Sequence, residues 1–148
     1  MTTTATRTES TTEATAKTGA KSTEFVLSAT RIVVGFLFVC HATQGLWGTF
    51  GGVDGAGGAV PLGSWPGWWG SLFELIGGAL VLAGLFTRVA AVLCSGVMAY
   101  AYFTVHAPMG LFPLQNMGEQ SVLFCWIFLL FAFVGPGRWA LDSLRRSA

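Results

Sequence analysis

One long apolar stretch, residues 74–106, constrains the fold more than any other part of the chain. Its only fully charged side chains are Glu74 and Arg88. The stretch is too long for one membrane crossing, which needs roughly 20 residues, and it is too apolar for a soluble helix. The run Gly-Leu-Phe-Thr-Arg at 84–88 supplies a break and a positive charge where a turn would lie. We therefore expect two antiparallel membrane helices joined near Arg88, with Glu74 carried into the bilayer by the first.

The composition of the whole chain supports a membrane protein with one domain. The sequence is 53% hydrophobic and 10% charged, whereas charged residues make up about 25% of a typical soluble domain. No basic patch is interleaved with aromatic residues, so we expect no nucleic-acid partner. The three cysteines lie in separate apolar segments and form no C-x-x-C motif, so we expect neither a disulfide nor a redox pair. They are Cys40, Cys94 and Cys125.

The pattern along the chain predicts an all-α, polytopic bundle of four transmembrane helices. Residues 1–24 are rich in threonine and contain no large apolar residue after Met1, which is typical of a disordered tail. Residues 25–142 form the expected membrane domain, and residues 143–148 form a short C-terminal tail. Within the domain we expect helices at about 25–47, 68–86, 89–106 and 119–135, separated by loops that contain glycines and prolines.

The basic residues predict the orientation of this bundle. Apart from Arg31, which is within the first helix, they lie before the first helix, between the second and third, and after the fourth, and the other two loops contain no Lys or Arg. The positive-inside rule therefore places both termini and Arg88 in the cytoplasm. Trp47, Trp65, Trp68 and Trp69 then gather at the outer membrane face, where tryptophans are enriched.

Polar side chains from all four expected helices share the outer half of the membrane. At 1.5 Å of rise per residue, His41 lies roughly 9 Å below Trp47, and Glu74 lies at a similar depth below Trp68. An acid at that depth is costly and is by default a functional hypothesis. The candidate site residues are His41, Gln44, Glu74, His106 and Glu119.

Each of these candidates also has a structural interpretation. Glu74 and His41 can be hydrogen-bonded core groups that hold the bundle together. Small residues on the same face of the second helix predict that Glu74 faces the interior of the bundle, with His41 as its first expected partner. His106 and Glu119 lie near the interface, where hydration costs little. Arg31 either extends to the cytoplasmic surface or reaches toward Glu74 as an ion-pair partner. No two of the His and Glu candidates have the i, i+3 or i, i+4 spacing of a metal motif on one helix, so we expect no metal site.

The same residues give the chain its resemblance to a known family. The segment R-I-V-V-G-F-L-F-V-C-H-A-T-Q-G from Arg31, F-E-L-I-G-G around Glu74 and G-L-F-T-R-V-A-A from Gly84 resemble the DoxX family of small bacterial membrane proteins. So do the M-x-x-A…H segment that ends at His106, N-M-G-E that ends at Glu119, and G-P-G-R-W-A-L-D from Gly135 to Asp142. The resemblance covers nearly all of residues 25–142. One departure is that the family's helix-one pattern H-G-x-x-K has Ala42 and Gly45 at its glycine and lysine positions here.

The resemblance implies a four-helix protein of the bacterial cell membrane. Some members of the family are named as membrane subunits of a thiosulfate:quinone oxidoreductase, and others act with oxidative-stress partners. We therefore expect an accessory of a membrane redox system, with a quinone as the candidate cofactor and a membrane or cytoplasmic redox protein as the candidate partner. Whether the chain is an enzyme stays open; if it is one, it is a subunit of a quinone-linked oxidoreductase. The alternative is a membrane scaffold that recruits a partner enzyme, whereas a transporter is disfavoured because few polar groups cross the bundle.

Overall fold

The computed structural model describes the backbone of residues 3–145 and the side chains of residues 17–143. All of the elements named over that range are helical, so the predicted all-α class is confirmed there. Four long helices make the body of the molecule: α1 Thr3–Trp47, α2 Gly67–Ala83, α3 Thr87–Ala101 and α4 Glu119–Val134. The shorter ones are η1 Thr49–Gly51, the π-helix η2 Tyr102–His106, η3 Ala107–Met109 and α5 Leu141–Arg145.

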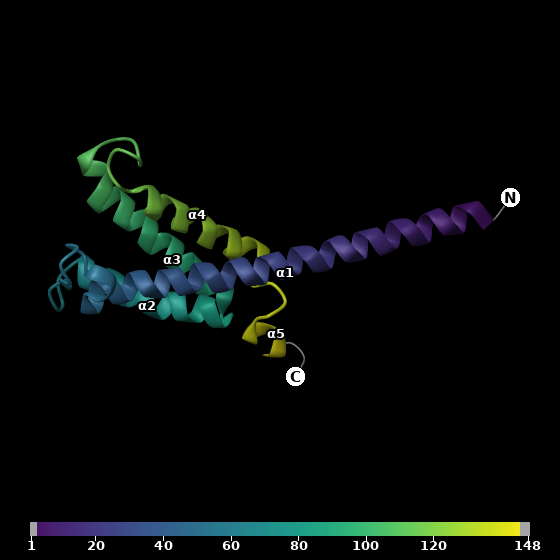
Figure 1. Cartoon of the computed structure of the whole chain (residues 1–148), viewed down its shortest axis with the longest axis horizontal. Coiled ribbons are helices and arrows are strands. Elements are labelled where there is room, and N and C mark those ends of the chain that lie inside the picture. Colours follow the sequence, from purple (N-terminus) through teal and green to yellow (C-terminus); the bar gives the residue numbers. More distant parts are fainter. Residues whose placement is uncertain (1–2, 146–148) are drawn as a thin grey trace.

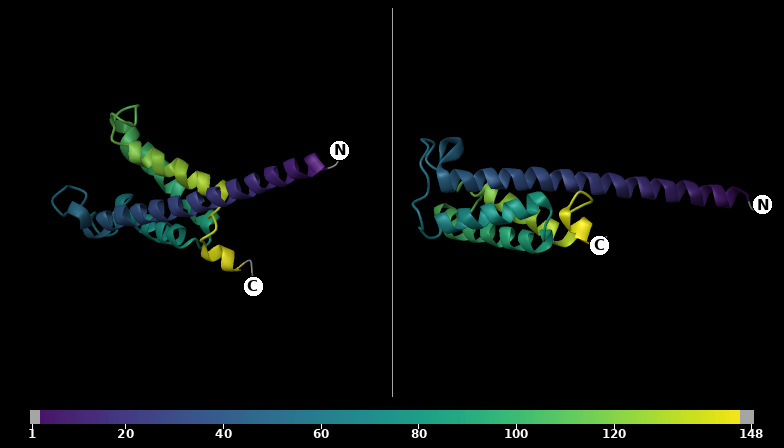
Figure 2. Two further views of the ribbon diagram at one scale, coloured as in Figure 1. Left: turned by 45° about the vertical axis from the view of Figure 1, so that its right-hand side comes forward. Right: turned by 90° about the horizontal axis from the view of Figure 1, so that it is seen from below.

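The four long helices form two antiparallel hairpins, α1 with α2 and α3 with α4, which meet through α2 and α3. Figure 1 shows the hairpins close together at the end formed by residues 84–87 and 135–142, which we call the turn end. They spread apart toward the loop end, which is formed by residues 48–66 and 102–118, and the left view of Figure 2 shows the same spread. The shape is therefore a bundle that is closed at one end and open at the other.

Aromatic packing holds the two hairpins together in the middle of the bundle. The ring of Phe38 on α1 lies 4.6 Å from that of Phe128 and 5.1 Å from that of Phe124, both on α4, measured between centroids. Phe38 and Phe128 are fully buried. Phe124 and Phe128 are one helical turn apart and therefore present one face of α4 to Phe38. These three rings form the floor of the open end.

Arg31 closes the turn end with its guanidinium group. The side chain is completely buried and donates hydrogen bonds to four backbone carbonyls. Two of them, on Val81 and Leu82, belong to the last turn of α2, where carbonyls have no partner within the helix. The other two belong to Pro136 and Trp139, in the segment that follows α4. Arg31 thus ties together three parts of the chain that are far apart in the sequence.

Asp142 fastens the last segment to the turn between α2 and α3. Its carboxylate accepts hydrogen bonds from the backbone N–H groups of Phe86 (2.8 Å) and Thr87 (2.9 Å) and from the Thr87 hydroxyl (3.0 Å). A carboxylate in this place satisfies N–H groups of the first turn of α3 that lack a helical partner. Gly84 allows the close approach, because it adopts φ +71° and a Cβ there would lie 2.6 Å from that of Ala140.

Helix α1 begins earlier than the sequence predicts. We expected the first helix to start near residue 25 after a disordered tail, but α1 is continuous from Thr3 to Trp47. The extra turns project beyond the rest of the molecule, as Figures 1 and 2 show. Side chains 17–26 on this part are exposed. Residues 1–2 and 146–148 of the two expected tails lie outside the described residues.

The helices differ in how well their lengths fit a membrane. Two helical segments of the described chain are long and apolar enough to cross one, Lys17–Trp47 and Thr87–Met109. The second segment includes the π-helix, so it ends three residues after His106, where the third helix was expected to end. The apolar helices α2 and α4 are shorter, with 17 and 16 residues.

Candidate functional site

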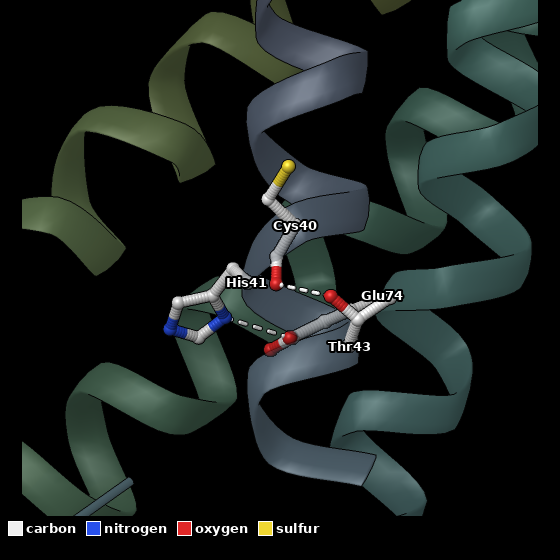
Figure 3. A network of polar contacts seen from close by, with 4 residues as sticks. All are labelled: Cys40, His41, Thr43 and Glu74. Carbon is white, nitrogen blue, oxygen red and sulfur yellow. Dashed lines mark hydrogen bonds and ion pairs between the residues drawn. The ribbon is translucent and has the colours of Figure 1, made fainter. Parts of the chain in front are cut away.

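His41 and Glu74 are in direct contact at the open end of the bundle. The Nδ1 atom of His41 on α1 lies 2.8 Å from Oε2 of Glu74 on α2, a distance that fits a strong hydrogen bond or an ion pair. Figure 3 shows the Glu74 side chain extending from α2 past α1 to the imidazole, whose other nitrogen, Nε2, points away from the carboxylate. The contact that the matched depths of these two residues predict is therefore present.

Glu74 faces the interior of the bundle, as its neighbours on α2 predict. The buried residues of α2 lie on one face of this helix: Ser71, Glu74, Gly77, Gly78 and Val81. The Glu74 side chain is only 7% exposed, whereas that of His41 is 40% exposed. The carboxylate is thus held in the packed interior, whereas the imidazole lies between it and the space at the open end of the bundle.

That space is a cavity of about 330 Å³, to which all four long helices contribute. Such a volume is at the small end of the range for ligand pockets. Of the five candidate site residues, His41, Gln44, Glu74 and His106 line it. Three apolar residues, Val97, Met98 and Phe124, form part of its wall. These four are half of the polar side chains that line the cavity; the others are Ser71, Tyr100, Gln120 and Ser121.

His106 reaches the cavity from the π-helix and is oriented by Asn116. Its Nδ1 lies 3.0 Å from the backbone carbonyl oxygen of Asn116, so Nδ1 carries a proton and donates it. Asn116 is buried and fixed in turn, because its Nδ2 donates to the Gly110 carbonyl and its Oδ1 accepts from the Gly118 N–H. Nε2 of His106 is then left for other partners, as it is in His41.

Asn116 was missed in the sequence, although a signal for it exists. An Asn that bonds the backbone N–H two residues later makes an Asx turn, and Asn-x-Gly is a common sequence for one. The chain reads Asn-Met-Gly at 116–118, and Met117 has the positive φ of 56° that such turns allow. Ser71 was also missed; it is buried, and it lines the cavity one helical turn before Glu74.

The remaining candidates lie outside the cavity. Glu119 is exposed at the start of α4 and lines a separate groove between α1 and α4. Arg31 is not a partner of Glu74, contrary to one of the two roles expected for it; its four hydrogen bonds all go to carbonyls at the turn end. Nor does it extend to the surface, since none of its side chain is exposed. Those carbonyls replace water as its solvation shell.

The loop after α1 covers part of the cavity. Gln44 donates a hydrogen bond to the carbonyl of Gly52 (2.9 Å), and Val60 donates its N–H to the carbonyl of Gly45 (2.8 Å). Val53 and Val60 from this loop line the cavity. Asp54 stabilises the loop itself, because its carboxylate accepts the N–H groups of Ala56 and Gly58. These two bonds lower the pKa of Asp54.

Gly45 has a packing role at the position where the family pattern has lysine. A Cβ atom on Gly45 would lie 2.1 Å from the hydroxyl oxygen of Ser71, far inside van der Waals contact. Ser71 therefore uses the space that any side chain at position 45 would need. In this chain the cavity lacks a lysine there, and the hydroxyl of Ser71 lines it instead.

Comparison with known proteins now places the chain. The sequence model of the DoxX family matches residues 26–107, more than half of the chain. The chain belongs to the DoxX family. It is also 40% identical over 124 residues to a protein of Haemophilus influenzae described as uncharacterized, an alignment that covers 80% of this chain and 90% of the relative. No solved structure matches it.

Family membership and the apolar helices agree that this DoxX protein is a membrane protein. The match covers α1 from residue 26, α2, α3 and the π-helix, and so it includes His41, Gln44, Glu74 and His106. The described residues contain no cluster of three or more His, Cys, Asp or Glu side chains that could hold a metal ion. The polar cavity is therefore the part of the DoxX protein where a function is to be sought.

Proposed function

We propose that this DoxX protein is an accessory of a membrane redox system that binds the head group of a quinone in the His41–Glu74 cavity. The observation that supports this is the 2.8 Å contact between a buried carboxylate and an imidazole whose second nitrogen is free to meet a ligand. A quinone ring is flat and apolar with two carbonyl acceptors. It matches a small cavity with apolar walls and two histidines, each anchored through Nδ1.

The arrangement can hold and move a proton at Nε2 of His41. With Glu74 ionised and His41 positively charged, Nδ1 donates to the carboxylate and Nε2 donates to a quinone carbonyl. If a partner redox protein reduced a quinone held there, the quinone would supply the proton acceptor, and Nε2 of His41 is the atom placed to donate one of the two protons that complete reduction requires. The Glu74 carboxylate stabilises the charged imidazole before the transfer and keeps its ring oriented.

Glu74→Gln is the direct test of this proposal. Glutamine has nearly the same shape and keeps a hydrogen bond to His41, but it cannot balance a positive charge on the imidazole. We expect the variant to accumulate and fold normally and to lose the response of the purified full-length protein to added quinone. The response is measured as quinone bound per protein and as proton uptake when the bound quinone is reduced by an added reductant.

Glu119→Gln is the matched control, because it makes the same chemical change on an exposed residue outside the cavity. It should leave both measurements at the wild-type level. If a stably folded Glu74→Gln protein binds quinone and takes up protons like Glu119→Gln, the proton-transfer proposal is wrong. A scaffold would then be the better description.

The scaffold has one structural observation in its favour, the part of α1 that projects beyond the bundle. Side chains 17–26 are exposed on a helix that extends past the bundle, and Trp139 is exposed near the same end. In this alternative a partner enzyme docks there, and the cavity takes no part in its activity. Removal of residues 3–24 would abolish recruitment of the partner, whereas Glu74→Gln would have no effect.

We also propose four membrane crossings with both termini in the cytoplasm. The 17 residues of α2 measure about 25 Å, somewhat less than the roughly 30 Å of a bilayer core, a mismatch that local thinning accommodates. Each short helix packs antiparallel along a longer one, so all four are expected to cross together. A cysteine placed at Asp54 in the loop after α1 should react with an impermeant reagent in intact cells. Reaction only after lysis would overturn this topology.

A further inference from the structure

A second hollow lies beside the cavity, between α2 and α3. Its volume is about 420 Å³, and none of its lining residues carries a charge. The walls are formed mainly by Phe73, Ile76 and Leu80 of α2 and by Ala90, Leu93 and Val97 of α3. We call this hollow the α2–α3 groove. Phe73, Ile76 and Leu93 are more than half exposed, so the groove opens on the outside of the bundle, toward lipid.

The α2–α3 groove adjoins the His41–Glu74 cavity. Pro66, Gly70, Val97 and Tyr100 line both spaces. At their junction the ring of Tyr100 packs edge-on against that of Trp65, with centroids 5.8 Å apart. One elongated molecule with a polar end near His41 and an apolar end between α2 and α3 would therefore pass beside this ring pair.

The other groove that meets the cavity is less suited to a hydrocarbon chain. It lies between α1 and α4 and shares Gln120 and Phe124 with the cavity. Glu119 and Gln120 line it. A hydrocarbon chain beside a carboxylate would displace the water that solvates the charge, and this is costly. Of the two grooves, the α2–α3 groove is therefore the one that matches an apolar chain.

We propose that the α2–α3 groove holds the hydrocarbon tail of the same ligand whose head group occupies the His41–Glu74 cavity. The inference rests on the proposed function and narrows the class of ligand. The ligand is a quinone with a long hydrocarbon tail that enters laterally from the bilayer, and not a water-soluble quinone ring. Lipid tails are as apolar as the groove, so the tail gains little hydrophobic free energy by moving into it. The groove therefore acts through its shape, by giving the tail a path that the packed helices would otherwise block.

Two glycines make the shape of the groove testable. A Cβ atom placed on Gly70 or Gly96 meets no other atom within 4 Å. A larger side chain at Gly96 thus enters the groove without a collision in the helix packing. Gly77 is unsuitable, since a Cβ there would lie 2.4 Å from Sγ of Cys94. Ala79→Leu is the matched control, because Ala79 is exposed on α2 and lines neither the groove nor the cavity.

The experiment compares two probes on full-length protein in nanodiscs: a benzoquinone without a tail, and the same ring with two isoprene units. Binding is followed by quenching of tryptophan fluorescence. For Gly96→Leu we expect the tailed probe to bind about ten-fold more weakly, which corresponds to about 1.4 kcal/mol of steric conflict. The tailless probe should bind Gly96→Leu like the wild type, and Ala79→Leu should change neither affinity.

Four results would overturn the inference while leaving the proposed function intact, and the first three are as follows. Gly96→Leu could bind the tailed probe as tightly as the wild type does, or it could bind both probes more weakly by the same factor. In a separate experiment, a tailed probe that carries a diazirine at the end of its tail could cross-link to α1 or α4. Cross-linking to α2 and α3 that excess tailless quinone displaces would support it. Cross-linking there that is not displaced would show an ordinary bilayer lipid in the groove and would also overturn it. If neither quinone binds the wild type, the proposed function itself fails.

Discussion

The burial of Arg31 leads to the most quantitative prediction about the stability of the bundle. Its guanidinium group donates to four carbonyls and has no exposed surface. Hydrogen bonds that involve a charged group contribute about 1.5–3 kcal/mol each, and a buried acceptor left without a donor costs about 1–3 kcal/mol. Arg31→Gln removes the charge, and a single amide group cannot reach carbonyls on two sides.

At least two of the four carbonyls would lose their donor in this variant. We therefore expect Arg31→Gln to lower the free energy of unfolding by about 2–6 kcal/mol, which is about 1–3 kcal/mol for each buried carbonyl left without a donor. Arg31→Lys keeps the charge but has a single donor centre, and it should fall between the wild type and Arg31→Gln. The measurement is reversible unfolding of the full chain in mixed micelles, followed by circular dichroism.

Arg88 provides the matched comparison. It also donates to two carbonyls at a helix end, those of Ala132 and Phe133, but it is exposed. Water can replace its hydrogen bonds, so Arg88→Gln should cost only about 0.5–1.5 kcal/mol. Equal losses for the two Gln variants, or a loss below about 1 kcal/mol for Arg31→Gln, would refute the argument that burial makes the Arg31 contacts strong.

Three further predictions concern other parts of the molecule. Asp142→Ala should destabilise the bundle by about 0.5–2 kcal/mol through loss of the cap on α3, and Asp142→Asn, which keeps an acceptor, should recover part of it in the same unfolding assay. Because backbone N–H groups lower the pKa of Asp54, the order of residues 54–58 should be kept at neutral pH and lost as the pH falls through that lowered pKa. Hydrogen exchange at the Gly58 amide reports this, and exchange that does not change with acid would contradict it. We expect no disulfide among Cys40, Cys94 and Cys125, so replacement of all three by alanine should leave quinone binding near normal. A mobility shift of the wild-type monomer on reduction would show a disulfide and contradict this expectation.

The sequence predicted the helices and the central pair well because both depend on local information. Apolar run lengths fix where a membrane helix can lie, and the expected ends at Trp47 and Glu119 agree with α1 and α4. The His41–Glu74 contact followed from equal depth below the tryptophans and from small residues on one face of α2. Depth and helix face are both properties of a single helix, so they can be read before the helices are packed.

The sequence did not reveal contacts that depend on how the segments meet. Arg31 was expected at the surface or beside Glu74, and nothing local shows that the carbonyls of Pro136 and Trp139 return to it. Glu119 was grouped with the cavity by depth alone, yet the spread of the hairpins leaves it in the neighbouring groove. The π-helix that carries His106 is likewise a tertiary feature, since its sequence has no glycine or proline.

The way in which residues 136–142 complete the turn end has a consequence for biosynthesis. Translation delivers Arg31 early, and it delivers Pro136 only 105 residues later. Until residues 136–142 have been made, the guanidinium group of Arg31 has only the two α2 carbonyls as partners. The first turn of α3 likewise lacks the hydrogen bonds from the Asp142 carboxylate. A chain released before residue 136 would keep the whole cavity and all of its lining residues, but its closed end would be unfinished. The hydrogen bonds that complete the turn end therefore form only after every cavity-lining residue has been made.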